Sequence, residues 1–276
     1  MIDETQQQTP PQDVPPPLES TPTEARESPP KPWGLRDLFL FIVFVPLGLF
    51  AANILVLLGY ALIQSTMHWH LPKEKLSADP FFLLALQTAF YGLMLAFIFF
   101  LVTVDHQQPF WPTLRWRRLT PGKILACLLG GALLTVAIAL LPPLLPDASQ
   151  FPLQNLFNSR AAAYAIGAFA ILVAPFMEEM IFRGILFAIF ESQVGLRFAI
   201  LITAVLFGGL HVPEYWGAWN HMFLIFLVGL VFSLARGMSG SLAPSVFLHV
   251  GYNGSMMLAL FLSTEHFRNL NVLPGP

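Results

Sequence analysis

The chain has 276 residues, of which 55% are hydrophobic and only 11% carry a charged side chain. An ordinary soluble domain has about 25% charged residues, so this chain cannot cover its apolar surface with polar groups in water. The composition excludes a cytosolic enzyme, a nucleic-acid-binding protein and a secreted disulfide scaffold, and it predicts a polytopic membrane protein embedded in a lipid bilayer. The single cysteine, Cys127, excludes an intrachain disulfide.

Residues 1–32 differ in composition from the rest of the chain. They hold nine prolines and six acidic residues, against the two basic residues Arg26 and Lys31. A segment with so few large apolar side chains cannot bury enough surface to offset its loss of conformational entropy. We therefore predict a disordered, Pro-rich, acidic tail, which also lacks the pattern of a signal peptide.

From Trp33 onward, long apolar runs alternate with short polar segments, and a helix that spans a bilayer needs about 20 residues. The runs lie at 38–64, 82–104, 123–145, 161–190, 197–212, 220–236 and 241–263. The fourth run is too long for one straight span and contains Pro175, which predicts a kink or a break. Backbone polar groups in lipid must be satisfied within helices. The expected fold is therefore an all-α bundle of seven transmembrane helices, or eight if the fourth run forms two spans.

The membrane region divides into three predicted parts. Residues 33–119 would form N-terminal transmembrane helices and a basic loop, residues 120–265 a second transmembrane domain, and residues 266–276 a short C-terminal tail. Cytoplasmic loops are enriched in Lys and Arg, and an N-terminus inside the cell places nine basic residues inside and four outside. The inside set is Arg26, Lys31, Arg36, Arg115, Arg117, Arg118, Lys123, Arg197 and Arg236, and the outside set is Lys73, Lys75, Arg160 and Arg268. We expect an integral multi-pass protein of a bacterial cell membrane with a cytoplasmic N-terminus.

Six polar side chains interrupt the apolar runs of the C-terminal half, where one ionisable group costs about 2.5–3.5 kcal/mol on insertion scales. They are Glu178, Glu179, Arg183, His211, His249 and Asn253. Glu179 and Arg183 are four residues apart, so on a helix they share a face and can form an ion pair. Glu178 is rotated about 100° from Glu179 and stays free for another partner. His249 and Asn253 are also four residues apart and share a helix face.

Taken together, Glu178, His211, His249 and Asn253 predict a convergent cluster within the membrane. A Glu and a His can activate a water molecule by taking its proton, and a second His with an Asn amide can donate hydrogen bonds to an oxyanion. These groups suffice to hydrolyse an amide without a covalent intermediate. The same residues also suit a zinc ion, with Glu178, His211 and His249 as ligands and a bound water as the nucleophile. Both alternatives stay open at this point.

Three short motifs carry a resemblance to a known family. Residues 178–183 read EEMIFR and fit EExxxR, residues 207–211 read FGGLH and fit FxxxH, and residues 249–253 read HVGYN and fit HxxxN. In this order, each inside an apolar run, they resemble the CPBP family of intramembrane proteases. This family comprises CAAX proteases and bacteriocin-processing enzymes, is also called the Abi family, and includes the type II CAAX prenyl endopeptidase. The resemblance covers about residues 120–260.

The resemblance implies a role for each motif residue. Glu178 would be the general base and His211 its partner on the water, while Glu179, paired with the Arg of its motif, would order the site. His249 and Asn253 would form the oxyanion hole. The implied function is an intramembrane endopeptidase that acts on a membrane-embedded or lipidated peptide or protein. The family is described both as metal-dependent and as glutamate-dependent, so zinc is a possible cofactor and none is certain.

Two other functions are compatible with the same residues. A proton-coupled transporter also uses intramembrane Glu and His, although many transporters have repeated halves, which this sequence lacks. A non-catalytic membrane scaffold or immunity protein would keep the polar residues for packing alone. A Gln in place of Glu178 separates these functions, because a scaffold would keep its activity.

Overall fold

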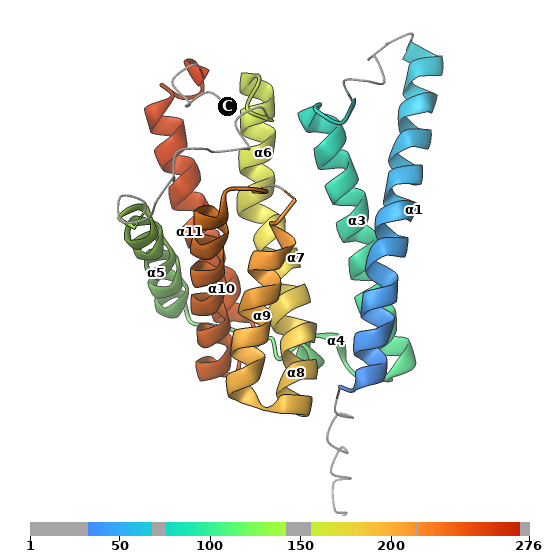
Figure 1. The fold of residues 1–276 in the computed structure, drawn as a ribbon, viewed down its shortest axis with the longest axis vertical. Coiled ribbons are helices and arrows are strands. Elements are labelled where there is room, and N and C mark those ends of the chain that lie inside the picture. Colours follow the sequence, from blue (N-terminus) through green and yellow to red (C-terminus); the bar gives the residue numbers. More distant parts are fainter. Residues whose placement is uncertain (1–32, 68–75, 142–155, 214, 271–276) are drawn as a thin grey trace, which may run out of the picture. The chain divides into compact units, whose positions relative to one another are not determined.

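The computed structural model describes residues 33–67, 76–141, 156–213 and 215–270, which belong to one compact unit, Lys31–Pro276. The predicted tail, residues 1–32, lies outside the described residues, as do residues 271–276. The described part contains helices and turns and no strand, so the all-α prediction is confirmed (Figure 1). The helices are α1 (Leu35–Met67), α3 (Pro80–Phe100), α4 (Phe110–Thr113), α5 (Pro121–Ala139), α6 (Arg160–Leu172), α7 (Ala174–Glu179), α8 (Phe187–Val194), α9 (Leu196–Leu210), α10 (Trp219–Ser239) and α11 (Ala243–Ser263). Two π-helical segments, η1 (Leu101–Asp105) and η4 (Met180–Leu186), extend α3 and join α7 to α8.

Six of the described helical segments are long and apolar enough to cross a membrane. They are α1, α3 with η1, α5, the continuous stretch Arg160–Val194 that contains α6 to α8, α10 and α11. The fifth apolar run, 197–212, forms α9, which has 15 residues, fewer than the roughly 20 of a full crossing. In the described part of the chain, the expected seven or eight spans thus become six long helices and one short one. The fourth run is broken, as predicted, but it continues in one direction and does not divide into two crossings (Figure 1).

Large apolar side chains are exposed along the outer faces of the long helices. Phe50 on α1 is 68% exposed, Leu133 on α5 is 70% exposed and Leu262 on α11 is 61% exposed. Soluble proteins rarely expose large contiguous apolar patches, whereas a bilayer accommodates such faces without cost. The protein is therefore an integral membrane protein.

Local sequence explains where several helices begin and end. The carboxylate of Asp79 accepts the backbone N–H of Phe82, and Pro80 occupies the first turn of α3, where its missing N–H has no intrahelical partner to lose. Ser159 caps α6 in the same way by accepting from the N–H of Ala162. Gly240 ends α10 in the left-handed region with a φ of 62°, which glycine adopts without strain. α11 then starts three residues later.

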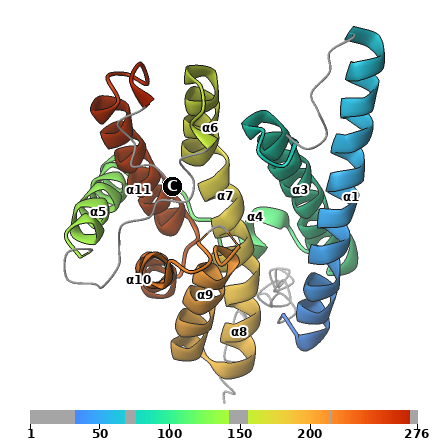
Figure 2. The same ribbon diagram turned by 45° about the horizontal axis from the view of Figure 1, so that its top comes forward.

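The buried core is centred on α7, η4 and α8 and extends to side chains of α1, α3 and α11. All seven residues of η4 are buried. α5 lies along α11 on the other side of the core, and α9 and α10 pack against each other (Figure 2). The predicted parts 33–119 and 120–265 therefore lie in one compact unit, and the polar residues of interest lie on helices that enclose its core.

Candidate active site

The two adjacent glutamates of the EExxxR motif lie just after the break in the fourth run. Pro175 stands in the first turn of α7, and because proline has no N–H, the carbonyl of Ile171 loses its usual helical donor. α7 ends at Glu179 and the π-helical segment η4 begins at Met180. A π-helical turn inserts an extra residue into the helix and often marks a functional site. Glu178 and Glu179 thus lie between two irregularities of the backbone.

Glu179 and Arg183 form the ion pair that their spacing predicted. Both side chains are fully buried, and the Arg183 guanidinium donates from Nη1 to Glu179 Oε1 over 2.9 Å. The other donors of Arg183 bind the carbonyl of Gly229 at 2.6 Å and the hydroxyl of Ser233 at 3.3 Å. A buried ion pair is stabilised when its other donors and acceptors also find partners, and α10 supplies these partners for Arg183.

Aromatic rings and a second arginine enclose this ion pair. The Arg183 guanidinium lies 4.6 Å from the ring centroid of Phe207 and 5.6 Å from that of Phe232, distances at which a cation and a ring attract each other. The carbonyl of Arg183 accepts a hydrogen bond of 3.0 Å from Nε of Arg236, which is itself buried. The charge of Arg183 is therefore held in one place by contacts from η4, α9 and α10.

His249 lies between the two glutamates. Its Nδ1 is 3.0 Å from Glu179 Oε1, so it donates a hydrogen bond to that carboxylate. Its Nε2 is 3.8 Å from Glu178 Oε2. The imidazole stacks on the ring of Phe232 with centroids 4.6 Å apart. The buried Glu179 thus fixes the ring orientation, and the opposite nitrogen of His249 faces Glu178.

Glu178 has a second neighbour that the sequence analysis missed. The hydroxyl of Tyr91, on α3, donates to Glu178 Oε1 over 2.9 Å. The Glu178 side chain is 14% exposed, whereas that of Glu179 is fully buried. Tyr91 belongs to no motif, and the one signal in the sequence is a polar side chain near the middle of the apolar run 82–104. The predicted freedom of Glu178 to face another partner is therefore realised by contacts to α3 and α11.

The structure places His211 and Asn253 at the edge of this group. His211 directly follows α9, and its Nδ1 is 2.8 Å from the carbonyl of Phe207. The Phe207 ring contacts both imidazoles, at centroid distances of 5.1 Å to His211 and 5.8 Å to His249. Asn253 donates from its amide nitrogen to the carbonyl of Ala170 over 2.8 Å. Glu178 therefore meets His249 directly, while His211 reaches the site through Phe207 and Asn253 joins α11 to the end of α6.

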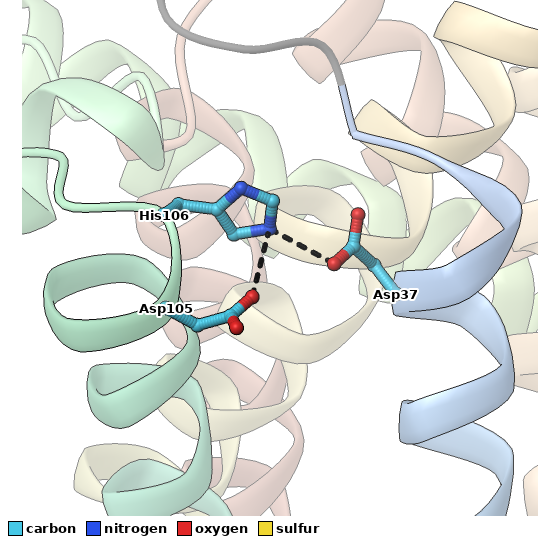
Figure 3. Close-up of side chains that lie close together, drawn as sticks. All are labelled: Asp37, Asp105 and His106. Carbon is cyan, nitrogen blue, oxygen red and sulfur yellow. Dashed lines mark hydrogen bonds and ion pairs between the residues drawn. The ribbon is translucent and has the colours of Figure 1, made fainter.

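A separate cluster of titratable side chains lies where α1 begins and η1 ends (Figure 3). The Nε2 atom of His106 lies 2.9 Å from Asp37 and 3.9 Å from Asp105. Asp105 also accepts two hydrogen bonds from Arg36, at 2.9 and 2.8 Å, and the N–H of Gly34 binds Asp37 at 2.8 Å. The carboxylate oxygens are thus occupied by protein donors, and the cluster joins α1 to the end of the α3–η1 helix.

This distant cluster bears on the zinc hypothesis. Within the described residues, the metal-ligating atoms of Asp37, Asp105 and His106 all lie within 4.8 Å of one another, close enough to share one ion. The atoms of Glu178, His211 and His249 do not meet that condition. The predicted three-ligand zinc site is therefore not formed by these side chains as they lie, and we derive no chemical step through a metal.

Comparison with known proteins gives a family for the region that carries the site. Residues 160–255, about a third of the chain, match the family model "Type II CAAX prenyl endopeptidase Rce1-like". An uncharacterized 24.3 kDa protein of Escherichia coli is 38% identical over 81 residues, which are 29% of this chain and 36% of that protein. No solved structure gives a significant match. Residues 160–255 include all six polar residues of the three motifs, and this region of the chain is similar to the Rce1-like family of CAAX proteases.

Proposed function

We propose that the chain is an intramembrane endopeptidase in which Glu178 is the general base. The observation that carries the proposal is the position of Glu178 Oε2, 3.8 Å from His249 Nε2, beside a fully buried Glu179–Arg183 pair. A carboxylate can take the proton of a water molecule that sits against it. The surrounding helices hold the group inside the apolar part of the protein, where such side chains are costly and are usually functional.

His249 faces both glutamates with its two ring nitrogens. Nδ1 lies 3.0 Å from Glu179 Oε1 and Nε2 lies 3.8 Å from Glu178 Oε2. We propose that His249 is a hydrogen-bond donor of the site and that its Nε2 faces the carbonyl oxygen of the substrate.

The proposed reaction is the hydrolysis of one peptide bond. Glu178 accepts a proton from the water, the hydroxide oxygen bonds to the carbonyl carbon, and the carbonyl oxygen becomes an oxyanion. His249 Nε2 and the second amide hydrogen of Asn253 are the proposed donors to that oxyanion. The C–N bond then breaks, and the proton held by Glu178 passes to the leaving amine. In this scheme His211 is the proposed second contact of the attacking water, reached from the end of α9.

The proposed substrate class is a membrane-embedded or lipidated peptide or protein. The matched family model is described by its action on prenylated CAAX ends, so a farnesylated peptide that ends in Cys-aliphatic-aliphatic-X is the defined probe of choice. A second probe makes no assumption about sequence, namely the set of peptides released from membranes that contain the full chain. The bilayer location of the site favours substrates that already reside in or on the membrane.

Glu178→Gln tests this function because it keeps the shape of the side chain and removes the base. A positioned general base contributes about 10²–10⁴-fold, so we expect release of the farnesylated probe and of membrane peptides to fall by that factor. The matched control is Glu191→Gln, since Glu191 pairs with Arg115 away from the site at 2.9 Å and should leave the rate unchanged. Protein levels in the membrane are compared for all three chains.

Two outcomes would change the proposal. Cleavage by Glu178→Gln at the parent rate contradicts the proposed role of Glu178 as the general base, and a parent chain that cleaves neither probe favours the scaffold. Loss of cleavage on chelation, with recovery on addition of zinc, would show that cleavage needs a metal, with Glu178, His211 and His249 as its candidate ligands.

A further inference from the structure

The N-terminal helices contribute one side chain to the neighbourhood of the proposed base. Tyr91 lies on α3, outside the family match of residues 160–255, and its hydroxyl donates to Glu178 Oε1 over 2.9 Å. Tyr91 is only 5% exposed. A buried hydroxyl that donates to a charged acceptor forms a stronger hydrogen bond than one between neutral groups. Packing alone therefore does not account for the contact between Tyr91 and Glu178.

The packing around Tyr91 fixes the position of its hydroxyl. The ring lies parallel to that of Phe169 on α6, with an interplanar angle of 5° and centroids 5.9 Å apart. It belongs to the same buried cluster as Met94, Met177 and Ile181. A buried tyrosine held by rings and aliphatic side chains has little freedom to move its oxygen. The donor is thus held in place whether or not Glu178 is ionised.

The two oxygens of Glu178 face different partners. Oε1 accepts from Tyr91, and Oε2 is the oxygen that faces His249 Nε2. A carboxylate tied down at one oxygen presents the other in a fixed direction, and preorganised groups of this kind are a main source of catalytic rate.

We propose that Tyr91 is a positioning residue that holds Glu178 with Oε2 toward the attacking water. The proton taken from that water goes to Oε2, and the hydrogen bond from Tyr91 to Oε1 persists through the step. This inference rests on the proposed function and extends it to α3, which makes the N-terminal helices part of the catalytic unit.

Tyr91→Phe in the full chain is the test, because it keeps the ring and its stacking on Phe169 and removes only the hydroxyl. A hydrogen bond to a charged group is worth about 1.5–3 kcal/mol, so kcat on the farnesylated probe should fall roughly 10-fold to 100-fold. KM should stay unchanged, since Tyr91 contacts the base and not the substrate. The control is Tyr164→Phe, because Tyr164 is 49% exposed and should leave kcat unchanged.

A thermal double-mutant cycle gives a second readout that needs no substrate. Tyr91→Phe and Glu178→Gln alter the same hydrogen bond, so their effects on Tm in detergent should not add. A parent-like kcat for Tyr91→Phe with additive shifts of Tm overturns the inference, and a lower Tm with a parent-like kcat also overturns it. Failure of the proposed function looks different, since there Glu178→Gln itself keeps the parent rate.

Discussion

At the level of single residues, Glu178 and Glu179 are neighbours in sequence with different surroundings. The spacing of Glu179 and Arg183 predicted their ion pair, because residues four apart lie on one face of a helix, and the structure has it at 2.9 Å. The partners from other helices could not be predicted in this way. Ser233 and Tyr91 contact the motif through tertiary packing, and nothing in their local sequence distinguishes them from other polar side chains in apolar runs.

The buried ion pair leads to a prediction about stability. Arg183→Ala leaves the Glu179 carboxylate fully buried without its cation, and breaking a buried pair costs about 3–5 kcal/mol. We expect a lower Tm in detergent and poor accumulation in the membrane. Arg160→Ala is the control, because Arg160 is exposed at the start of α6. An Arg183→Ala protein that melts with the parent would show that the pair contributes nothing to the fold.

At the level of helices, the sequence predicted the break at Pro175 and missed the π-helical turn that follows it. The break at Pro175 has a local cause that can be read from the sequence, because proline lacks a backbone N–H. The π-helical segment Met180–Leu186 has no such residue, and Arg236 of α10 stabilises it by donating to the carbonyl of Arg183. The length of α9 was visible in the sequence, because the apolar run 197–212 nearly coincides with Leu196–Leu210, but the prediction counted that run as a full crossing. The π-helical segment, by contrast, depends on contacts between helices.

Close packing of α5 and α11 supports a second prediction. A Cβ on Gly251 would lie 2.8 Å from the Cα of Leu128 and nearer still to its carbonyl oxygen, and a Cβ on Gly131 would lie 2.6 Å from the N of Tyr252. Small residues let membrane helices approach in this way. Gly251→Ala should therefore separate the two helices at a cost of about 1–3 kcal/mol, seen as a lower Tm. It should also reduce cleavage, because Gly251 lies between His249 and Asn253. Gly254→Ala is the control, since its Cβ would meet no atom within 4 Å; equal Tm values for the two variants would contradict the prediction.

At the level of the whole chain, contacts in the structure relate the ends of the helices to one another. Arg36 at the start of α1 binds Asp105 at the end of η1, and the N–H of Leu242, just before α11, binds the carbonyl of Arg115. The start of α9 lies against the end of α10, because a Cβ on Gly237 would touch Leu196. The helix ends joined by these contacts therefore lie on the same side of the helix bundle. Seven basic side chains of the described residues lie there, and two lie at the other ends of the helices. The seven are Arg36, Arg115, Arg117, Arg118, Lys123, Arg197 and Arg236, and the two are Arg160 and Arg268.

This distribution predicts the orientation in the membrane. The side with more Lys and Arg should be cytoplasmic, so the loop around Arg117 faces the cytoplasm and the end of α11 faces outward. The short length of α9 does not alter the result, because α9 starts and α10 ends on the same side, and the pair returns the chain to where it began. The measurement is labelling of intact cells with an impermeant maleimide, in a Cys127→Ser background with one new cysteine at a time. Arg268→Cys should react in intact cells, whereas Arg117→Cys and Ser20→Cys should react only after permeabilisation. Labelling of Arg117→Cys and Arg268→Cys from the same side would contradict both the charge rule and the order of the helices.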